Sequence, residues 1–182
     1  KIFSFDILKK ILFVAIPSIL QQSFVSVGNI FIQGLVNTFG DIIVAGFSAA
    51  GKLNTFTITT LTALGNSMSS YTAQNVGAGK YDRVIKGAKQ GVLIAVFCSA
   101  VITSSILLFG KGLMGVFTDT TELVEMSYRL MKILAVGYIA MAVTQSLSGV
   151  MRGAGDTMTP MWISLITTVL IRVPLAYSIS FL

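Results

Sequence analysis

Long apolar stretches separated by short polar segments dominate this chain. Each stretch supplies the roughly 20 apolar residues that an α-helix needs to cross the hydrocarbon core of a membrane. Inside lipid a helix satisfies its own backbone hydrogen bonds, so helices are the expected form. The stretches without charge, or with one, are 11–40, 42–79 (Lys52), 90–110, 133–151 and 157–182 (Arg172). The pattern predicts an all-α, polytopic transmembrane bundle with five spans, at about residues 11–37, 42–73, 88–110, 122–150 and 159–181.

Composition supports a membrane protein. Of the 182 residues, 54% are hydrophobic and 11% are charged, whereas soluble domains are about 25% charged. There is no histidine and only one cysteine, Cys98, which excludes imidazole chemistry and an internal disulfide framework. We expect one transmembrane domain over residues 1–182, and the odd number of spans predicts that this domain is incomplete.

The charges alternate between the two ends of the predicted bundle, and the net charge is +6. Basic residues next to membrane helices follow from the positive-inside rule. We therefore expect a cytoplasmic N-terminus and a lipid bilayer as the partner, with no nucleic acid. The basic ends carry Lys1, Lys9 and Lys10, then Lys80, Arg83, Lys86 and Lys89, then Arg152; the opposite ends carry Asp41, and Asp119, Glu122 and Glu125 against Lys111.

The segment NVGAGKYDRVIKGAKQG, residues 75–91, contains a GAGK sequence that resembles part of a phosphate-binding loop. A nucleotide loop has the pattern G-x-x-x-x-G-K-[ST] after a strand. Here an apolar helix precedes the segment, and Tyr81 follows Lys80. We interpret it as a cytoplasmic loop in which Gly77 and Gly79 permit a tight turn.

Polar residues recur on one face of several predicted spans. Amides and hydroxyls in lipid either bond to neighbouring helices or line a wet cavity. Both interpretations stay open for the first span. The faces comprise Ser18, Gln22, Ser26, Asn29, Gln33 and Asn37; Lys52, Thr55, Thr59, Thr62 and Asn66; Tyr138, Gln145, Gly149 and Arg152; and Ser164, Thr168 and Arg172.

Two cations and two prolines interrupt the spans. The positions of Lys52 and Arg172 predict depths near mid-membrane, where an unpaired cation costs at least about 2.5 kcal/mol. No acidic residue of the chain is predicted at that depth. We expect a carboxylate from protein outside this sequence as the partner; water, backbone carbonyls, a substrate anion or snorkelling to an interface are the alternatives. Pro17 and Pro174 predict kinks.

Four motifs carry a family resemblance: "VNTFGD", "YTAQNVGAGKYDRVIKGAKQG", "MRGAGDTMTP" and "IRVPLAY". In this order and spacing they resemble the multidrug and toxic compound extrusion (MATE) transporters, in particular the C-terminal lobe of bacterial NorM- or DinF-like members. The resemblance implies half of a twelve-helix transporter with two six-helix lobes around a cleft. It implies exchange of organic cations or other amphipathic compounds for sodium ions or protons by alternating access. The chain would then be five helices of the second lobe, with the N-terminal lobe as its missing partner.

The resemblance implies that the polar faces of the first and second spans line the cleft. With no deep carboxylate in the chain, the coupling ion is expected to bind mainly outside it, and no residue is expected to be catalytic or to bind a metal. The expected location is the plasma (inner) membrane of a bacterium. The expected cleft-lining residues are Gln22, Asn29, Gln33, Asn37, Lys52, Asn66, Gln145 and Arg172.

Three other functions remain as alternatives. A lipid-linked oligosaccharide flippase of the same wider superfamily would use a basic cleft for its pyrophosphate, although the loop motifs favour an exporter. A membrane enzyme would need a nucleophile and base, a metal set or paired carboxylates at depth, and the sequence shows none. A channel subunit would form an oligomeric pore lined by small polar residues.

Overall fold

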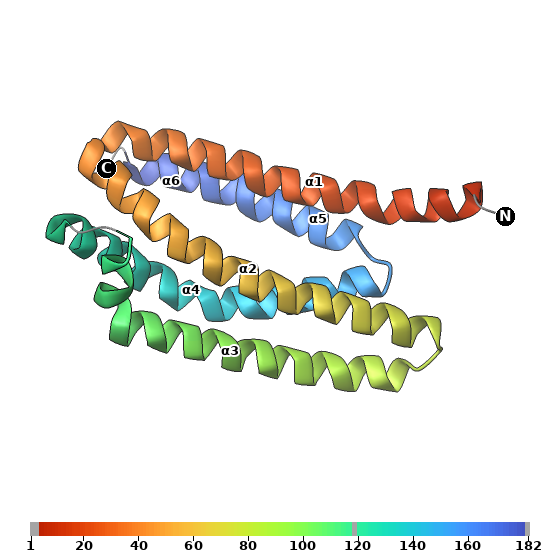
Figure 1. Cartoon of the computed structure of the whole chain (residues 1–182). Coiled ribbons are helices and arrows are strands. Elements are labelled where there is room, and N and C mark those ends of the chain that lie inside the picture. Colours follow the sequence, from red (N-terminus) through yellow and green to blue (C-terminus); the bar gives the residue numbers. More distant parts are fainter. Residues whose placement is uncertain (1–3, 118–119, 181–182) are drawn as a thin grey trace.

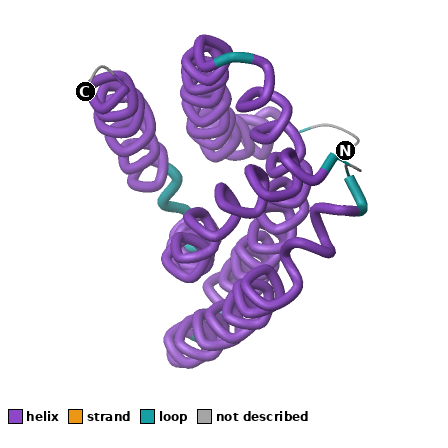
Figure 2. The backbone as a smooth tube through the Cα atoms, turned by 90° about the vertical axis from the view of Figure 1, so that its left-hand side faces the viewer, coloured by secondary structure: helices purple, strands orange, loops and turns teal. Residues whose placement is uncertain are grey.

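The computed structural model describes residues 4–117 and 120–180. Within them the chain is helical apart from short connections (Figure 2). The elements are α1 (Phe5–Val36), the 3-10 turn η1 (Asn37–Phe39), α2 (Asp41–Gly77), α3 (Tyr81–Gly115), α4 (Thr121–Gly153), α5 (Met158–Ser164), the π-helical segment η2 (Leu165–Arg172) and α6 (Val173–Ser180). The predicted all-α fold is therefore confirmed. Lys1, Asp119 and the predicted end of the last span at residue 181 lie outside the described residues.

In the part of the chain that the structure describes, four helical stretches are long and apolar enough to cross a membrane: Phe5–Phe39, Tyr81–Gly115, Thr121–Gly153 and Met158–Ser180. The predicted span at 42–73 is present as α2, but α2 does not reach the same level of hydropathy. Lys52, Asn54, Asn66 and a run of threonines make it more polar. A helix with so many polar side chains is best accommodated where other helices surround it.

The helices run further than the charge-free stretches that predicted them. The predicted loop at 75–91 is mostly helix: α2 ends at Gly77, and α3 begins at Tyr81. Arg83, Lys86 and Lys89 therefore lie on the first turns of α3. Only the turn between the helices requires a left-handed backbone conformation, which Gly79 adopts with φ +69°. The loop prediction was wrong because charge marks where lipid ends, whereas a helix continues into water while its backbone bonds are made.

The helices form two groups. In the first, α2 packs against α4 and α3; in the second, α1 lies beside α5, η2 and α6, to which it runs parallel (Figure 1). The packed core belongs to the first group. Its buried side chains come from α2, α3 and α4 and include Leu61, Ile106, Met114, Met131 and Tyr138.

Small residues let α2 and α4 approach closely. A Cβ placed on Gly149 would overlap the backbone carbonyl oxygen of Gly65, and one on Gly65 would lie 2.7 Å from the carbonyl oxygen of Gln145. Gly153, one turn further along α4, faces the carbonyl oxygen of Ser69 in the same way. Such small-residue contacts are typical of helix packing in membranes, where burial of apolar surface gives no advantage over lipid.

Candidate functional site: a polar groove between the two helix groups

A groove of about 740 Å³ lies between the two helix groups. It draws on α1, α2, α4 and the fifth-span helix, so neither group forms it alone. The walls are unusually polar for a membrane bundle, because eleven neutral side chains that can hydrogen-bond line it. These are Ser18, Gln21, Gln22, Thr59, Thr62, Asn66, Thr144, Gln145, Ser148, Ser164 and Thr167.

Three of the eight expected cleft residues line this groove. Gln22 contributes from α1, Asn66 from α2 and Gln145 from α4. The side-chain amide of Gln145 donates to the Thr62 hydroxyl over 2.9 Å, which ties α4 to α2 along the wall. The groove therefore contains part of all four predicted polar faces, since Ser164 of the fifth span also lines it. Some of these polar groups serve as interhelical contacts at the same time.

Asn29 and Arg172 lie elsewhere and contact each other. Arg172 Nη1 donates to Asn29 Oδ1 over 3.0 Å, joining η2 to α1. Nearby, a Cβ on Gly28 would lie 2.5 Å from the Thr168 side chain, so the two helices are close at this level. The described part of the chain thus gives Arg172 an amide oxygen as a hydrogen-bond partner; the carboxylate expected from outside the sequence stays a prediction.

Gln33, Asn37 and Lys52 also lie outside the groove. Gln33 Nε2 donates to Asn37 Oδ1 over 2.9 Å, a contact within one helical end. The Lys52 ammonium lies 5.8 Å from the centre of the Phe117 ring. An aromatic face is an electrostatic partner for a cation, and Phe117 follows the end of α3. This partner was not among those considered from the sequence, because nothing in the spacing of residues 52 and 117 links them.

Several groove residues lie outside the polar faces that the sequence predicts. Gln21, Thr144 and Thr167 line the groove, but none belongs to the polar faces read from the sequence. A usable signal was present for Gln21, since it lies next to Gln22 and three residues after Ser18, on the same side of a helix. Thr144 and Thr167 each donate to a carbonyl one turn earlier, so hydroxyl content alone would not have separated them from other threonines of the chain.

Among the residues that the structure describes, Arg152 is the only charged one that lines the groove. It lies in the last turn of α4 and is half-buried. Its position at the C-terminal end of a helix is electrostatically favourable, because the helix dipole is negative there. Within residues 4–117 and 120–180, its guanidinium has neither an ion pair nor a side-chain hydrogen bond within the usual distances.

The π-helical segment η2 sets how the fifth span presents its side chains. Across its end, the Val173 N–H donates to the Thr168 carbonyl, five residues earlier. Pro174 follows directly, and it lacks the N–H that would continue the usual helical ladder. The π-helical segment therefore ends directly before this proline, and π segments are common at functional sites. The kink predicted at Pro174 itself stays a prediction. α1 is assigned as helix through Pro17 without a break, so the kink there stays a prediction.

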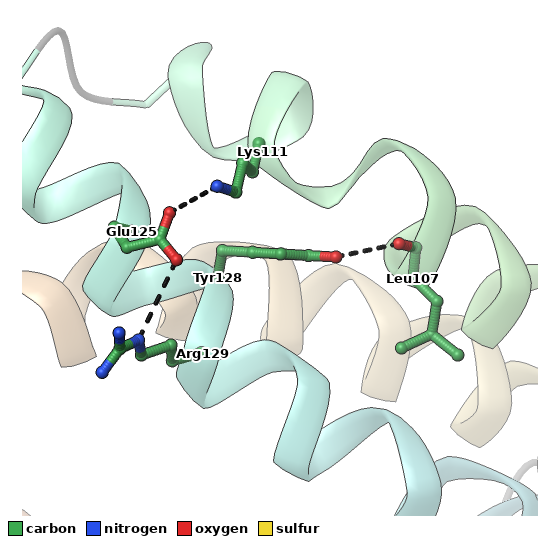
Figure 3. Close-up of polar contacts among 5 residues, drawn as sticks. All are labelled: Leu107, Lys111, Glu125, Tyr128 and Arg129. Atoms are coloured by element: carbon green, nitrogen blue, oxygen red, sulfur yellow. Dashed lines mark hydrogen bonds and ion pairs between the residues drawn. The ribbon is translucent and has the colours of Figure 1, made fainter.

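A cluster of charged side chains lies at the end of the bundle opposite Arg152, where α3 ends and α4 begins (Figure 3). Lys111 Nζ is 2.6 Å from Glu125 Oε2, and Arg129 Nε is 3.9 Å from Glu125 Oε1. The Tyr128 hydroxyl donates to the Leu107 carbonyl over 2.9 Å. These contacts fasten α3 to α4 far from the groove, and the side chains are exposed, so each ion pair is worth little by itself.

Comparison with known proteins places this arrangement in a family. The family model described as MatE matches residues 17–178, which is most of the chain. The chain belongs to the MatE family. The resemblance drawn from the four motifs is confirmed, and with it the assignment to a multi-pass membrane protein.

Curated relatives and solved structures agree with this family. Probable multidrug resistance protein YpnP of Bacillus subtilis (strain 168) is 32% identical over 164 residues, which is 90% of this chain and 37% of YpnP. Probable multidrug resistance protein YoeA of the same organism is 23% identical over 175 residues, which is 96% of this chain and 38% of YoeA. The solved structure of an outward-facing multidrug resistance MATE family transporter has a TM-score of 0.85 and 21% identity, covering 92% of this chain and 37% of that one. The MatE chain described here therefore spans less than two fifths of the length of these proteins.

Proposed function

We propose that this MatE chain is one lobe of a secondary active multidrug exporter. The exporter moves amphipathic or cationic compounds by alternating access and exchanges them for sodium ions or protons. It lies in the plasma membrane of a bacterium, with Lys9 and Lys10 of this chain on the cytoplasmic side, and a second lobe completes the cleft. The relatives named for multidrug resistance support export over lipid flipping.

The observation that carries the proposal is the polar groove. A polar substrate that leaves water for a path through a bundle loses its hydrogen bonds with water. Side chains along the path must therefore offer hydrogen bonds in their place. The groove supplies eleven such side chains at the contact between two helix groups that have separate packing. Ligand sites between the helices of a bundle are the common arrangement.

We further propose that the coupling ion binds mainly outside these residues. Sodium ions and protons are usually held by carboxylates within the membrane. The acidic residues of the described chain lie in first turns or connections: Asp6, Asp41, Asp82 and Glu122 are in the first turns of α1, α2, α3 and α4, Glu125 follows one turn later, and Asp156 precedes α5.

Transport by the full-length protein in proteoliposomes tests the proposal. A fluorescent amphipathic cation should be exported when a sodium or a proton gradient is imposed, and export should stop when that gradient is collapsed. Gln22→Leu should lower the rate several-fold, because it removes a hydrogen-bonding side chain from the groove. Gln90→Leu is the matched control, since Gln90 is an exposed glutamine on α3 outside the groove. Flux that needs no gradient would instead indicate a channel.

A further inference from the structure

The groove lacks the groups that proteins use to hold a cation. Its lining residues, all within the described part of the chain, include no Asp or Glu and no Phe, Tyr or Trp. Organic cations are recognised by carboxylates or by aromatic faces. An ammonium group entering this groove would meet neutral dipoles and one like charge, Arg152, and like charges at close range are repulsive.

Arg152 has the properties of an anion contact. A guanidinium presents five donors in a planar fork that matches the oxygens of a carboxylate, sulfonate or phosphate. Asp156, the nearest acid along the chain, is engaged elsewhere, because its Oδ1 accepts from the backbone N–H of Thr159 over 3.0 Å. Among the described residues, the guanidinium of Arg152 therefore has no acidic partner, and it borders the groove.

The neutral lining suits a substrate that hydrogen-bonds. Gln21 and Gln22 face the groove from α1, opposite the Gln145–Thr62 pair on α4 and α2. Each amide carries both a donor and an acceptor. A substrate that displaces water from these amides keeps its affinity only if it forms hydrogen bonds in place of those made by the water. A purely apolar compound would leave them unsatisfied.

We propose that this groove binds the neutral or oxyanionic, hydrogen-bonding part of a substrate, with Arg152 as the contact for a carboxylate, sulfonate or phosphate. The cationic end of a substrate is then held outside this groove. The inference rests on the proposed function, since it assumes that the groove lies on the substrate path, and it narrows the class of compound that this lobe selects.

Equilibrium binding of three dansyl probes to the purified full-length protein tests the inference. The probes share one fluorophore and differ in charge: dansylglycine carries a carboxylate, dansylglycine amide is neutral and dansylcadaverine carries an ammonium. Dansylglycine should bind the wild type about tenfold more tightly than dansylglycine amide, a difference of about 1.4 kcal/mol. Arg152→Gln should lower the affinity for dansylglycine about tenfold and change the affinity for the neutral amide by no more than about twofold.

Two further variants separate a specific contact from a loss of structure. Arg152→Lys keeps the charge but loses the planar fork, so it should recover part of the affinity for dansylglycine. Lys86→Gln removes a cation near the same end of the bundle but outside the groove, and should change none of the three affinities. Equal weakening of all three probes by Arg152→Gln, or an affinity for dansylglycine that Arg152→Gln leaves unchanged, would overturn the inference.

Transport of the same probes in proteoliposomes distinguishes this inference from the proposed function. The expected binding pattern with no gradient-driven transport of any probe would reject the export function and keep the anion contact. Gradient-driven transport that prefers dansylcadaverine and is insensitive to Arg152→Gln would keep the export function and reject the anion contact.

Discussion

The amide oxygen of Asn29 accepts a hydrogen bond from the guanidinium of Arg172. This contact joins α1 to η2 through residues that are 143 positions apart in sequence. Hydrogen bonds between membrane helices contribute about 0.6 kcal/mol on average, because the separated helices also find partners. A hydrogen bond from a charged donor to an amide acceptor is stronger than one between neutral groups. Asn29 therefore holds the second helix group together as well as solvating a cation.

A double-mutant cycle on Asn29 and Arg172 measures this contact. Asn29→Ala and Arg172→Ala should each destabilise the purified protein, and the double variant should be less destabilised than their sum by about 1 kcal/mol. Denaturant or thermal unfolding in detergent provides the free energies. A coupling energy of zero between two well-folded single variants would show that the pair is adventitious.

At the scale of elements, the crossing of α2 and α4 depends on the absence of side chains at Gly65 and Gly149. The two backbones touch there, so no rotamer of a larger residue can avoid the contact. Overpacking of a well-packed interface costs about 1–3 kcal/mol. The same crossing carries the Gln145–Thr62 bond of the groove wall, so its geometry also sets the groove.

Gly149→Ala should lower stability by about 1–3 kcal/mol and reduce binding in the groove. Gly137→Ala is the control, because it makes the same change on the same helix at a site where a Cβ meets nothing within 4 Å. The control should be neutral or stabilise α4 by up to about 1 kcal/mol, the difference in helix propensity between glycine and alanine. Equal effects of the two substitutions in unfolding measurements would contradict the packing explanation.

The start of the fifth span depends on a carboxylate. Hydrogen bonds from the Thr159 side chain and then its backbone N–H hold the pKa of the Asp156 carboxyl below its ordinary value of 3.8. Because the folded pKa is the lower one, the charged carboxylate stabilises the fold at pH values above 3.8. That stabilisation declines as the pH falls below 3.8 and is lost below the folded pKa.

Asp156→Ala should therefore lower the unfolding temperature at neutral pH, and the gap from the wild type should close as the pH falls below 3.8. Thermal unfolding of both proteins from pH 7 downward provides the measurement. Asp156→Asn is the matched control: an amide oxygen can still accept from Thr159, but its contribution does not titrate. A gap for Asp156→Ala that is unchanged at low pH would show that the carboxylate charge is not involved.

At the scale of the whole molecule, the two helix groups differ in how they are held. The cluster of buried apolar side chains lies in the group of α2, α3 and α4. The buried residues of α1 are Pro17 and Gly28, so the second group depends more on polar contacts and on lipid. The groove lies at the boundary between the groups, where a relative movement would change its width.

The basic residues near one end of the bundle predict its orientation. In a Cys98→Ala background, Ala78→Cys should be protected from a membrane-impermeant thiol reagent added to intact cells, and Thr38→Cys should be labelled. Replacing Lys80, Arg83, Lys86 and Lys89 with glutamine should produce mixed labelling at both positions, because the positive charges that retain this end in the cytoplasm are gone. Labelling of Ala78→Cys alone in the unaltered charge background would invert the predicted topology.

The elements could be predicted from local pattern, and the contacts between them could not. Apolar runs of sufficient length located all five predicted helical spans, including the polar α2. The helix ends were predicted less well, because charge reports the limit of the lipid rather than the last backbone hydrogen bond. The polar faces were visible as a repeat of three or four residues, but the repeat does not show which helix each face meets.

The candidate site shows the same division. Gln22, Asn66 and Gln145 were selected as polar residues on helical faces, and all three line one groove. Asn29 and Arg172 were selected on the same grounds, and they contact each other instead. Arg152 was placed on the same polar face as Gln145 but not among the expected cleft-lining residues, and it borders the groove from the last turn of α4.

The sequence by itself determined the class of protein, the positions of the membrane helices and the family, because these depend on apolar length, charge alternation and short motifs. The tertiary structure alone decided that α1 pairs with the fifth span and that a groove without carboxylates or aromatic rings, among the described residues, separates the two groups. The physical reason is that helix pairing depends on close contact at glycines, with the backbone of the neighbouring helix at Gly65 and Gly149 and with the Thr168 side chain at Gly28. Whether a glycine is in such a contact depends on a partner helix that is distant in sequence, which no local pattern contains.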